Sequence, residues 1–521
     1  MYKLFQSVQD EIYPEIEGTI HGDIPKWLNG NLYRNGPGIF EVGKTKYFHW
    51  FDGMAVLQHF RIANGKVYYQ RRFLKSNTYK CNLEAKRIVI SEFGTRAYPD
   101  PKQNSLMTLI RKFTKEEKTD NCPISIVRIG NDLFASSETN ILHRFDGKTL
   151  ETLEKIDIHQ IIQVNQATAK VHYDDHGVLH NLGYSYGVGT PKYCLFTLSS
   201  GSQSRGDSSQ KYTGHLISAI DVANTFHPSY IHSFAMTENY YVFLEQPYVI
   251  NVWDVAAAEV KKLNMIECLE WRKDCRVRFH IIDRKTGKEI NSKYIYETMP
   301  FLCVNIGNAY EMDGHIVIDL STFRDNEVLS RYFMTNLAFD IPGATSEGNF
   351  PPATYRRFVL PLDLEGQSSI GENLITTGNL HALAILSSKS VVNLTSDVIC
   401  NTPFELPTIN TKFDGKRYKY VYGVTFQSEP KFASSLIKLD VEDKFSREWK
   451  EEDCFPSEPT FIARPGGESE DDGVLIASVN TTDDEKLCYL LVLDGKTMEE
   501  IARAYFKVWI PKDLHGLFVS D

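Results

Sequence analysis

The sequence lacks the cysteine spacing of a zinc-binding or disulfide-linked protein, and it also lacks long apolar runs. Its nine cysteines are scattered over 521 residues and form no C-x-x-C pair, so neither a zinc ribbon nor a disulfide framework is indicated. No window approaches the roughly 18 consecutive apolar residues of a spanning helix. The start, MYKLFQSVQDEIYPEIEG, lacks the apolar core of a signal peptide. These absences predict a cytoplasmic protein, in solution or attached peripherally to a membrane.

A concentrated positive charge is also missing. The formal net charge is −10 and the pI is near 5.9, and no basic run is interleaved with aromatic residues. Nucleic-acid binding needs a concentrated positive field, so we expect no nucleic-acid partner. Hydrophobic residues make up 42% of the chain, which is enough for a large buried core.

The sequence does contain a long series of strand-like segments joined by tight turns. The turns carry Asn-Gly, Asp-Gly and Asp-Asp-Gly, which supply the positive φ that short hairpins need. Many hairpins without alternating helices predict a large, closed all-β fold in a single domain, residues 1–521. A β-propeller fits because radial repetition removes open sheet edges, although no clean repeat fixes the number of blades. The strand-like segments are 54–73, 132–150, 166–183, 240–253, 276–290, 314–323, 418–426 and 473–496.

One amphipathic helix is predicted within this β-rich pattern. In SLMTLIRKFTKEEK, residues 105–118, an apolar stripe at i, i+3, i+4 and i+7 is formed by Leu106, Leu109, Ile110 and Phe113. Lysines and arginines surround this stripe, and a basic amphipathic segment can lie in a membrane interface. The pattern alone favours the other interpretation, a surface helix packed on the propeller.

The segment QATAKVHYDDHGVLHNLG, residues 166–183, predicts a strand, a turn at 174–177 and a second strand. Lys170 and His172 are two residues apart, so on a strand their side chains point to the same face. If that face looks inward, a lysine occupies a place where lysines are rarely found.

Five further polar residues lie in apolar or proline-framed surroundings. His232 lies in PSYIHSFAMTENYYVFLEQP, and His515 lies in IPKDLHGLF near the end of the chain. Glu138 lies in SSETNILHRFD, Glu405 in TPFELPTIN, and Glu458 in FPSEPTFIARP. A carboxylate in such a setting is costly unless it is paired. The glutamates therefore predict either a structural hydrogen-bond network or a set of partners that orient metal-bound histidines.

Several of these stretches occur together in a recognisable order: NGNLYRNGPGIFEVG, HWFDGMAV, GTRAYPDP, SSETN, YIHSFAMTENYYVF, TPFELPTIN, FPSEP, EDDGVL and LHGLF. Over essentially the whole chain, the sequence resembles the carotenoid cleavage oxygenase family. The resemblance is strongest to its animal branch of carotene oxygenases, retinoid isomerohydrolase and insect carotenoid isomerooxygenase.

That resemblance implies a seven-bladed β-propeller with Fe(II) on its axis, held by four histidines that three glutamates orient. It also implies a dome with an apolar tunnel for a carotenoid or retinoid, in which Ser137 faces the cleavage chamber. The family docks on membranes through a basic and apolar patch, and residues 105–118 occupy the corresponding position. The resemblance thus raises the membrane interpretation of that segment above the packed helix.

The family's site residues carry over only in part. His232 matches the ligand in the family's histidine-serine-phenylalanine motif, and His515 matches the ligand in histidine-glycine-leucine-phenylalanine. Glu138, Glu405 and Glu458 match the three glutamates that orient the ligands.

The two other ligand histidines are replaced. The family's run alanine-threonine-alanine-histidine-proline-histidine reads ATAKVH here, so Lys170 takes the ligand position and His172 corresponds to the histidine that does not bind the metal. Counting back without a gap from Asn308-Ala309-Tyr310-Glu311 places Asn305 at the other ligand position.

These replacements make a poor cage for divalent iron. A lysine ammonium has no lone pair, its unperturbed pKa is about 10.4, and an asparagine offers only a carbonyl oxygen. His172 is a possible alternative ligand, but two residues along a strand move it by roughly 6.6 Å. We expect instead that the Lys170 ammonium projects along the propeller axis. There it would offset the charge of the three glutamates, directly or through His232, His515 and Asn305, with Asn305 donating to a glutamate. In the alternative, the lysine bends away into a loop and the centre holds water.

Three functions remain open at this point. The first is a degenerate family member that binds a carotenoid, apocarotenoid or retinoid without iron-dependent cleavage. The second is an active Fe(II)-dependent dioxygenase or isomerooxygenase that splits a polyene double bond with O2. The third is a propeller that acts as a protein-interaction module and binds no pigment. Because function lives in the site and not in the fold, metal content and pigment binding decide among them.

Overall fold

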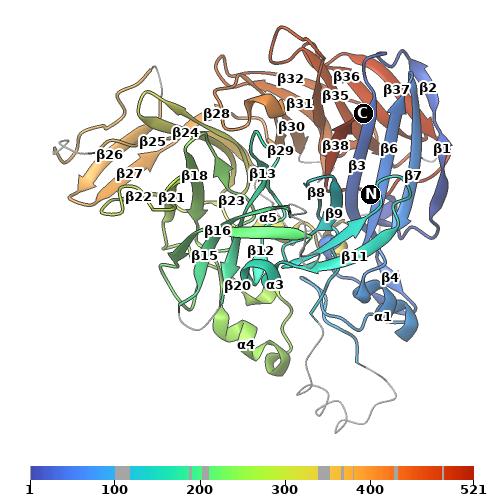
Figure 1. Ribbon diagram of the computed structural model, residues 1–521, viewed down its shortest axis with the longest axis horizontal. Coiled ribbons are helices and arrows are strands. Elements are labelled where there is room, and N and C mark those ends of the chain that lie inside the picture. The colour runs from blue at the N-terminus through green and yellow to red at the C-terminus, as the bar shows by residue number, and fades with distance from the viewer. Residues whose placement is uncertain are drawn as a thin grey trace.

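The computed structural model contains seven main sheets, antiparallel except for one pair of strands, arranged as the blades of a seven-bladed β-propeller (Figure 1). It describes residues 2–99, 118–186, 190–201, 211–337, 352–364, 369–378, 381–426, 432–483 and 486–521. The propeller prediction is confirmed. The predicted helix at 105–118, with Leu106, Leu109, Ile110 and Phe113, lies outside the described residues except for its last residue, Lys118.

The ring is closed by strands from both ends of the chain. In the first blade the order is β1 (Ile12–Glu17), β7 (Lys66–Phe73), β6 (Met54–Ala63), β3 (Gly30–Ile39) and β38 (His515–Ser520). The last strand of the chain therefore pairs with an early one, with Asn35 opposite His515. The blade formed by the last part of the chain likewise includes one early strand. It contains β33 (Cys454–Pro456), β34 (Thr460–Ala463), β35 (Gly473–Thr481), β36 (Cys488–Asp494), β37 (Glu500–Phe506) and the early strand β2 (Thr19–Gly22).

The remaining five blades follow one another along the chain, except that β26 and β27 of the third lie between two strands of the fourth. One contains β8 (Ser125–Ile129), β9 (Asp132–Ser136), β10 (Ile141–Phe145) and β11 (Thr152–Asp157). The next contains β12 (Gln166–Ala167), β13 (His172–Tyr173), β14 (Leu179–Ser185), β15 (Lys192–Ser200) and β16 (Tyr212–Asp221). The third has six strands: β17 (Ala235–Met236), β18 (Tyr240–Glu245), β21 (Val277–Asp283), β22 (Ile295–Thr298), β27 (Val391–Thr395) and β26 (Leu383–Ser388). The last two contain β23 (Leu302–Met312), β24 (His315–Phe323), β25 (Thr354–Pro361) and β28 (Asp397–Cys400), then β29 (Glu405–Thr408), β30 (Tyr420–Phe426), β31 (Ala433–Asp440) and β32 (Phe445–Lys450).

Local turn chemistry explains several of the hairpins. Asn64 and Gly65 both have positive φ, 53° and 75°, and they join β6 to β7. Asp313 and Gly314 do the same between β23 and β24, as two-residue hairpins require. The Asp-Asp-Gly prediction fails at Gly473, because this glycine begins β35 and pairs with Ala463 instead of turning the chain.

The core lies between the blades, where the middle strands are covered on both faces. Every residue of β24, β31 and β35 is buried. Their sequences are apolar in part and also bury polar side chains, among them Asp319 of β24 and Lys438 of β31. The inner end of each blade is then free to present polar side chains toward the axis.

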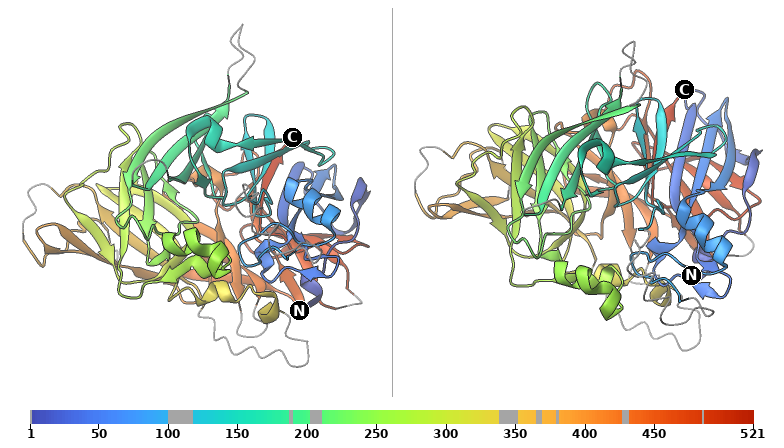
Figure 2. Two further views of the ribbon diagram at one scale, coloured as in Figure 1. Left: turned by 90° about the horizontal axis from the view of Figure 1, so that it is seen from below. Right: turned by 60° about the horizontal axis from the view of Figure 1, so that its bottom comes forward.

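Helices are few among the described residues, and α1 and α4 lie at one end of the molecule (Figure 2). Segment 240–253 was predicted as strand throughout, but β19 ends at Ile250 and a helix follows. The side chain of Asn251 accepts from the backbone of Trp253 and Asp254, which starts the helix. The helices are α1 (Asn77–Ala85), α3 (Ile158–Ile162), α4 (Val252–Lys261), α5 (Glu327–Ser330) and α6 (Met334–Leu337), and two small sheets pair β4 (Glu41–Val42) with β5 (Thr45–Lys46) and β19 (Tyr248–Ile250) with β20 (Leu269–Trp271).

Candidate functional site

Four side chains from four blades make up the site predicted from the sequence, and we call Lys170, His232, Asn305 and His515 the hub. Lys170 lies between β12 and β13, and His232 lies just before β17. Asn305 belongs to β23, and His515 is the first residue of β38. The imidazole rings of His232 and His515 are 6.1 Å apart between centroids, and both line one cavity together with Asn305.

The predicted strand at 166–173 is interrupted at the lysine. Only Gln166–Ala167 and His172–Tyr173 pair with β14. Between them the Thr168 hydroxyl donates to the Lys170 carbonyl at 2.8 Å. Because the strand is broken here, Lys170 and His172 do not share one strand face, which corrects the expectation from spacing alone.

The Lys170 side chain reaches Glu458 and His515. Its Nζ lies 3.0 Å from Glu458 Oε1 and 2.9 Å from His515 Nδ1. Glu458 Oε1 is also 2.8 Å from His515 Nδ1, and its other oxygen accepts from Arg34 Nη1 at 3.4 Å. Burial opposes ionisation of Glu458. The neighbouring His515, Lys170 and Arg34 outweigh burial and hold the pKa of this carboxyl well below its usual range. Burial, with Lys170 adding to it, lowers the pKa of His515 to about 4.

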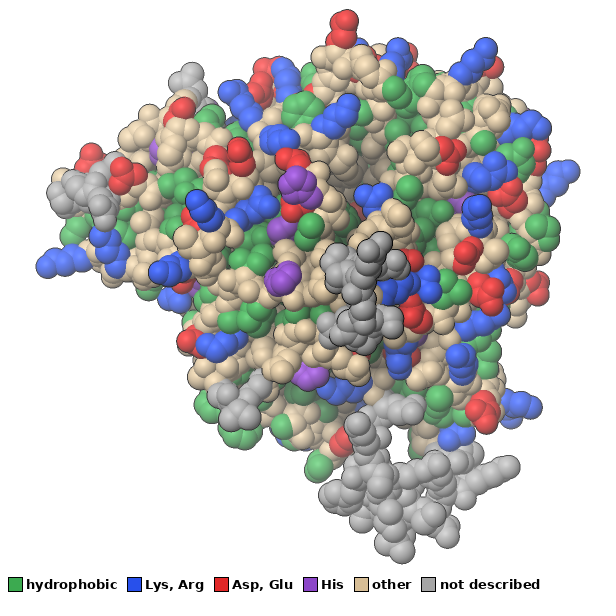
Figure 3. All heavy atoms as spheres, viewed as in Figure 1, with side chains coloured by type: hydrophobic (Ala, Val, Ile, Leu, Met, Phe, Trp, Pro, Cys, Tyr) green, Lys and Arg blue, Asp and Glu red, His purple; other side chains and the backbone are tan. Residues whose placement is uncertain are grey.

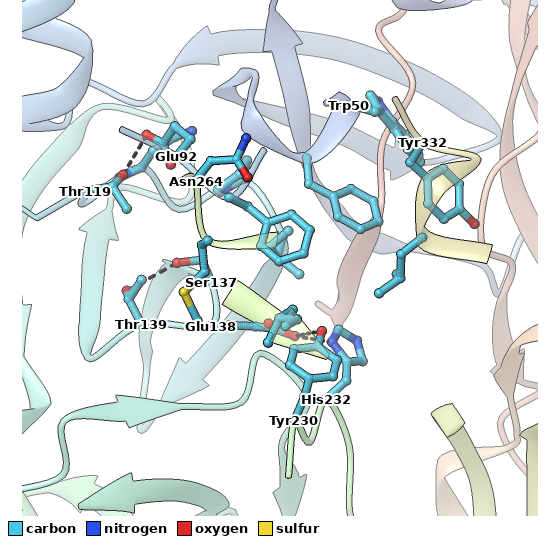
Figure 4. A pocket seen from close by; sticks show the side chains of 18 of the residues that line it. Trp50, Glu92, Thr119, Ser137, Glu138, Thr139, Tyr230, His232, Asn264 and Tyr332 are labelled. Atoms are coloured by element: carbon cyan, nitrogen blue, oxygen red, sulfur yellow. Dashed lines mark hydrogen bonds and ion pairs between the residues drawn. The ribbon is translucent and has the colours of Figure 1, made fainter. Parts of the chain in front are cut away.

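Glu138 forms a second carboxylate pair with His232. Its Oε1 contacts His232 Nδ1 and accepts from the Tyr230 hydroxyl at 2.8 Å. The other ring nitrogen, His232 Nε2, is buried and has no hydrogen-bond partner among the described residues. Figure 4 shows His232, Tyr230 and Glu138 grouped together at one wall of the cavity.

The third glutamate, Glu405, is paired with an arginine. Its Oε1 lies 3.5 Å from Arg331 Nη1, and both side chains are buried. Burial raises the pKa of Glu405 to about 7 although Arg331 opposes the shift. Asn305 was expected to donate to a glutamate. In the described structure its Oδ1 is buried without a hydrogen-bond partner, and no hydrogen bond joins it to Glu405.

Both ring nitrogens of His172 are engaged away from the hub. Nδ1 lies 3.0 Å from Asp414 Oδ2, and Nε2 lies 2.9 Å from the Phe234 carbonyl oxygen. Burial disfavours its charged form, but the Asp414 carboxylate outweighs burial and raises the pKa of His172. In this arrangement neither nitrogen is directed at the hub.

A cavity of about 1760 Å³ opens beside the hub. Common ligand pockets measure about 300–1,000 Å³, so this one can hold a long molecule. Ser137 lines it and its hydroxyl lies 3.2 Å from that of Thr139. Trp50 and Tyr332 lie on the opposite side from Ser137 (Figure 4). Most of the wall is apolar, with Phe51, Val89, Ile90, Phe93, Ile250, Leu263, Phe323, Leu329, Leu406, Phe426, Phe432 and Leu514.

Three partners of the glutamates were not predicted from the sequence: Arg34, Arg331 and Tyr230. Arg34 is 1% exposed and also donates to Asp513 and to the Leu514 carbonyl. Arg34 and Tyr230 lie inside recognised motifs, NGNLYRNGPG and YIHSF. The polar residues of these motifs could have indicated partners for the glutamates. Arg331 lies in the stretch VLSRYF, which carries no comparable motif.

The described residues contain no group of three or more histidine, cysteine, aspartate or glutamate side chains placed to hold a metal ion. No helix among them is long and apolar enough to cross a membrane. On the face shown in Figure 3, lysine and arginine are interspersed with aspartate and glutamate.

Comparison with known proteins covers nearly the whole chain. The family model described as retinal pigment epithelial membrane protein matches residues 5–520. Beta,beta-carotene 15,15'-dioxygenase of Rattus norvegicus is 38% identical over 524 residues, which cover 99% of this chain and 91% of that protein. The mitochondrial carotenoid-cleaving dioxygenase of Mustela putorius furo is 38% identical over 513 residues, covering 97% and 94%.

Solved structures show the same fold at lower identity. A variant of the Synechocystis apocarotenoid oxygenase has a TM-score of 0.75 and 20% sequence identity, over 100% of this chain and 98% of that one. A chimera of the same oxygenase has a TM-score of 0.75 at 21% identity, with the same coverage. The family model, the two relatives and this shared propeller together show that the chain belongs to the carotenoid oxygenase family.

Proposed function

We propose that this chain binds an apolar polyene, a carotenoid, apocarotenoid or retinoid, beside a hub that holds no iron. The observation that carries the proposal is the Lys170 amine, 3.0 Å from Glu458 and 2.9 Å from His515. An ammonium donates hydrogen bonds and offers no lone pair to a cation. The nitrogen of His515 that the amine contacts, Nδ1, also lies 2.8 Å from Glu458 Oε1. The amine therefore stands beside His515 where the family resemblance implies a third imidazole, and it cannot replace that imidazole as a metal ligand.

The donor set at the hub does not fit Fe(II). Divalent iron is held by neutral imidazoles and carboxylates around open positions, and the hub offers only two imidazoles, those of His232 and His515. Two of the three glutamates also have cationic partners of their own, so no dication is needed to neutralise those two. Glu458 is matched by Lys170 and Arg34, and Glu405 by Arg331. Lys170 was expected to offset all three carboxylates, directly or through His232, His515 and Asn305. Its amine contacts Glu458, and Glu405 pairs with Arg331 instead.

One observation supports a second candidate, an active Fe(II)-dependent carotenoid dioxygenase or isomerooxygenase. His232 Nδ1 contacts Glu138 while Nε2 is buried and unpartnered. Metal-ligating histidines commonly have one nitrogen on a carboxylate and the other free for the ion. The relatives named as dioxygenases at 38% identity support the same candidate.

We place the protein in the cytoplasm. The cavity and helix α4 support the proposal that its polyene is taken up from a membrane surface. Trp253 and Val260 of α4 are 61% and 87% exposed, and Trp253 stacks on Phe226 with ring centroids 5.2 Å apart. Other residues of α4, among them Val252 and Ala258, line the cavity. Exposed apolar groups beside a cavity wall suit a ligand that dissolves in lipid. Trp253→Asp should therefore reduce co-sedimentation with phosphatidylcholine vesicles, and an unchanged bound fraction would contradict docking through α4.

Elemental analysis of purified protein, together with a cleavage assay, tests whether the hub holds iron and whether the protein cleaves a carotenoid. We expect far less than one iron per chain and no O2-dependent cleavage of β-carotene. The combined substitution Lys170→His and Asn305→His should recover iron binding. A matched control, Lys438→His, changes another buried lysine that pairs with Asp471 at 2.7 Å, and should recover none.

The opposite results would decide between the two candidates. A full equivalent of iron in the parent chain, lost in His232→Ala and accompanied by β-carotene cleavage, would establish the dioxygenase. If neither β-carotene nor retinol changed its absorption or the thermal stability of the protein, polyene binding would be wrong. The third interpretation, an interaction module, would then remain.

A further inference from the structure

A buried lysine outside the hub lines the cavity. Lys512 lies between β37 and β38 and is 3% exposed. Its Nζ donates to the Phe455 carbonyl oxygen at 2.7 Å and lies 5.5 Å from the centroid of the Phe432 ring. Among the described residues no carboxylate forms an ion pair with it. Neither the family resemblance nor the proposed hub chemistry uses this amine.

The position of Lys512 brings its amine near the hub. Lys512 stands three residues before His515, and its acceptor Phe455 stands three residues before Glu458. Asp513, Leu514, Pro456 and Ser457, which lie between these points, all line the cavity. An amine held here can meet the end of an elongated ligand that extends along the apolar wall.

The other lysines near the cavity have different surroundings. Lys170 is paired with the Glu458 carboxylate at 3.0 Å. Lys118 and Lys262 line the cavity but are exposed to solvent. A lysine becomes a nucleophile when an apolar site removes it from water and from carboxylates. Burial lowers the pKa of Lys512 to about 7, with Arg34 adding to the shift and Asp513 opposing it. A large neutral fraction is therefore present at neutral pH.

We propose that Lys512 captures aldehyde-ended polyenes, such as retinal or an apocarotenal, as a covalent imine. The amine nitrogen bonds to the aldehyde carbon, and the carbonyl oxygen leaves as water with both amine hydrogens. No oxidant or reductant is consumed. If the imine then takes up a proton, its N–H can donate to the Phe455 carbonyl oxygen that the amine contacts now. This inference rests on the proposed function and names its ligand class.

Borohydride trapping of the full-length protein with all-trans-retinal tests the proposal. Reduction fixes the imine as a secondary amine, so the peptide that contains Lys512 should gain the mass of retinal less one oxygen atom. The trapped adduct should be lost in Lys512→Met and in Lys512→Arg, which retains a cation but forms no imine under these conditions. Lys438→Met is the matched control, because it removes a buried lysine elsewhere, and it should retain the adduct.

Retinol separates this inference from the proposed function, since an alcohol cannot form an imine. Borohydride should fix no retinol adduct in the parent, and the thermal unfolding transition of Lys512→Met shows whether that variant is folded. If the parent binds retinol but retinal is trapped elsewhere or not at all, imine capture is wrong and polyene binding stands. If neither retinol nor β-carotene binds, the proposed function itself fails. Trapping that persists in Lys512→Met would overturn the assignment to this residue.

Discussion

Replacing Lys170 by methionine tests whether its amine stabilises the hub. At an effective dielectric constant of about 20, Coulomb's law gives roughly 5 kcal/mol of attraction for charges 3.0 Å apart. The Lys170 side chain is 28% exposed, so water screens part of this attraction. Arg34 also remains 3.4 Å from Glu458 in the variant. We therefore expect a loss of about 2 kcal/mol in the free energy of unfolding, below the 3–5 kcal/mol typical of a fully buried pair that loses one partner.

Urea unfolding at neutral pH measures this loss, and an unchanged m-value would show that the same surface is exposed on unfolding. Lys438→Met is the comparison, because the side chains of Lys438 and Asp471 are only 6% and 11% exposed. This substitution should lower the free energy of unfolding by more than Lys170→Met does. The pKa of Glu458 is held below its ordinary value of 4.5. The contribution of Lys170 is therefore fully present above about pH 4.5 and shrinks as the pH falls. A Lys170→Met protein as stable as the parent, or more stable, would refute the stabilising role of the amine.

Two further predictions concern the scaffold. Burial raises the pKa of Asp52 to about 7 despite hydrogen bonds from Thr95 and Gly94. The folded state therefore holds a proton that the unfolded chain releases, and unfolding free energy should fall by about 2 kcal/mol from about pH 5 to about pH 7. Asp52→Asn should flatten this slope in urea titrations, and an equal slope in both proteins would contradict it. A Cβ on Gly307 would lie 1.9 Å from the Tyr355 hydroxyl oxygen. Gly307→Ala should thus cost about 1–3 kcal/mol, and less in a Tyr355→Phe background.

The all-β fold was predictable because its hairpins depend on local signals. Asn64-Gly65 and Asp313-Gly314 set turns between neighbouring strands, and the sequence records both directly. The blades were harder to delimit, since one of them joins strands that lie far apart. β22 pairs in parallel with β27, with Ile295 opposite Val391, and no local pattern predicts such a pairing. That residues 1–521 form a single domain stays a prediction.

The hub residues were predicted through family motifs, whereas their cationic partners were not. Lys170 was identified because it replaces a histidine in an otherwise familiar run. Arg331 pairs with Glu405 across 74 positions of sequence, and Arg34 reaches Glu458 across 424. Such pairings depend on how the blades are arranged around the axis, and only the folded chain brings these charges together. The strand break at Lys170 was also hidden, because it depends on the hydrogen bond from Thr168 to the lysine carbonyl.

The pairing of β3 with β38 has a consequence for the order in which the protein folds. Strands from opposite ends of the chain must meet before the first blade is complete, with Asn35 opposite His515. Contacts of such long sequence separation form late, because loop-closure entropy must be overcome first. A folding intermediate in which β38 has not yet paired with β3 therefore lacks His515 at the hub, and the contact between the His515 ring and the Lys170 amine forms only when the first blade closes.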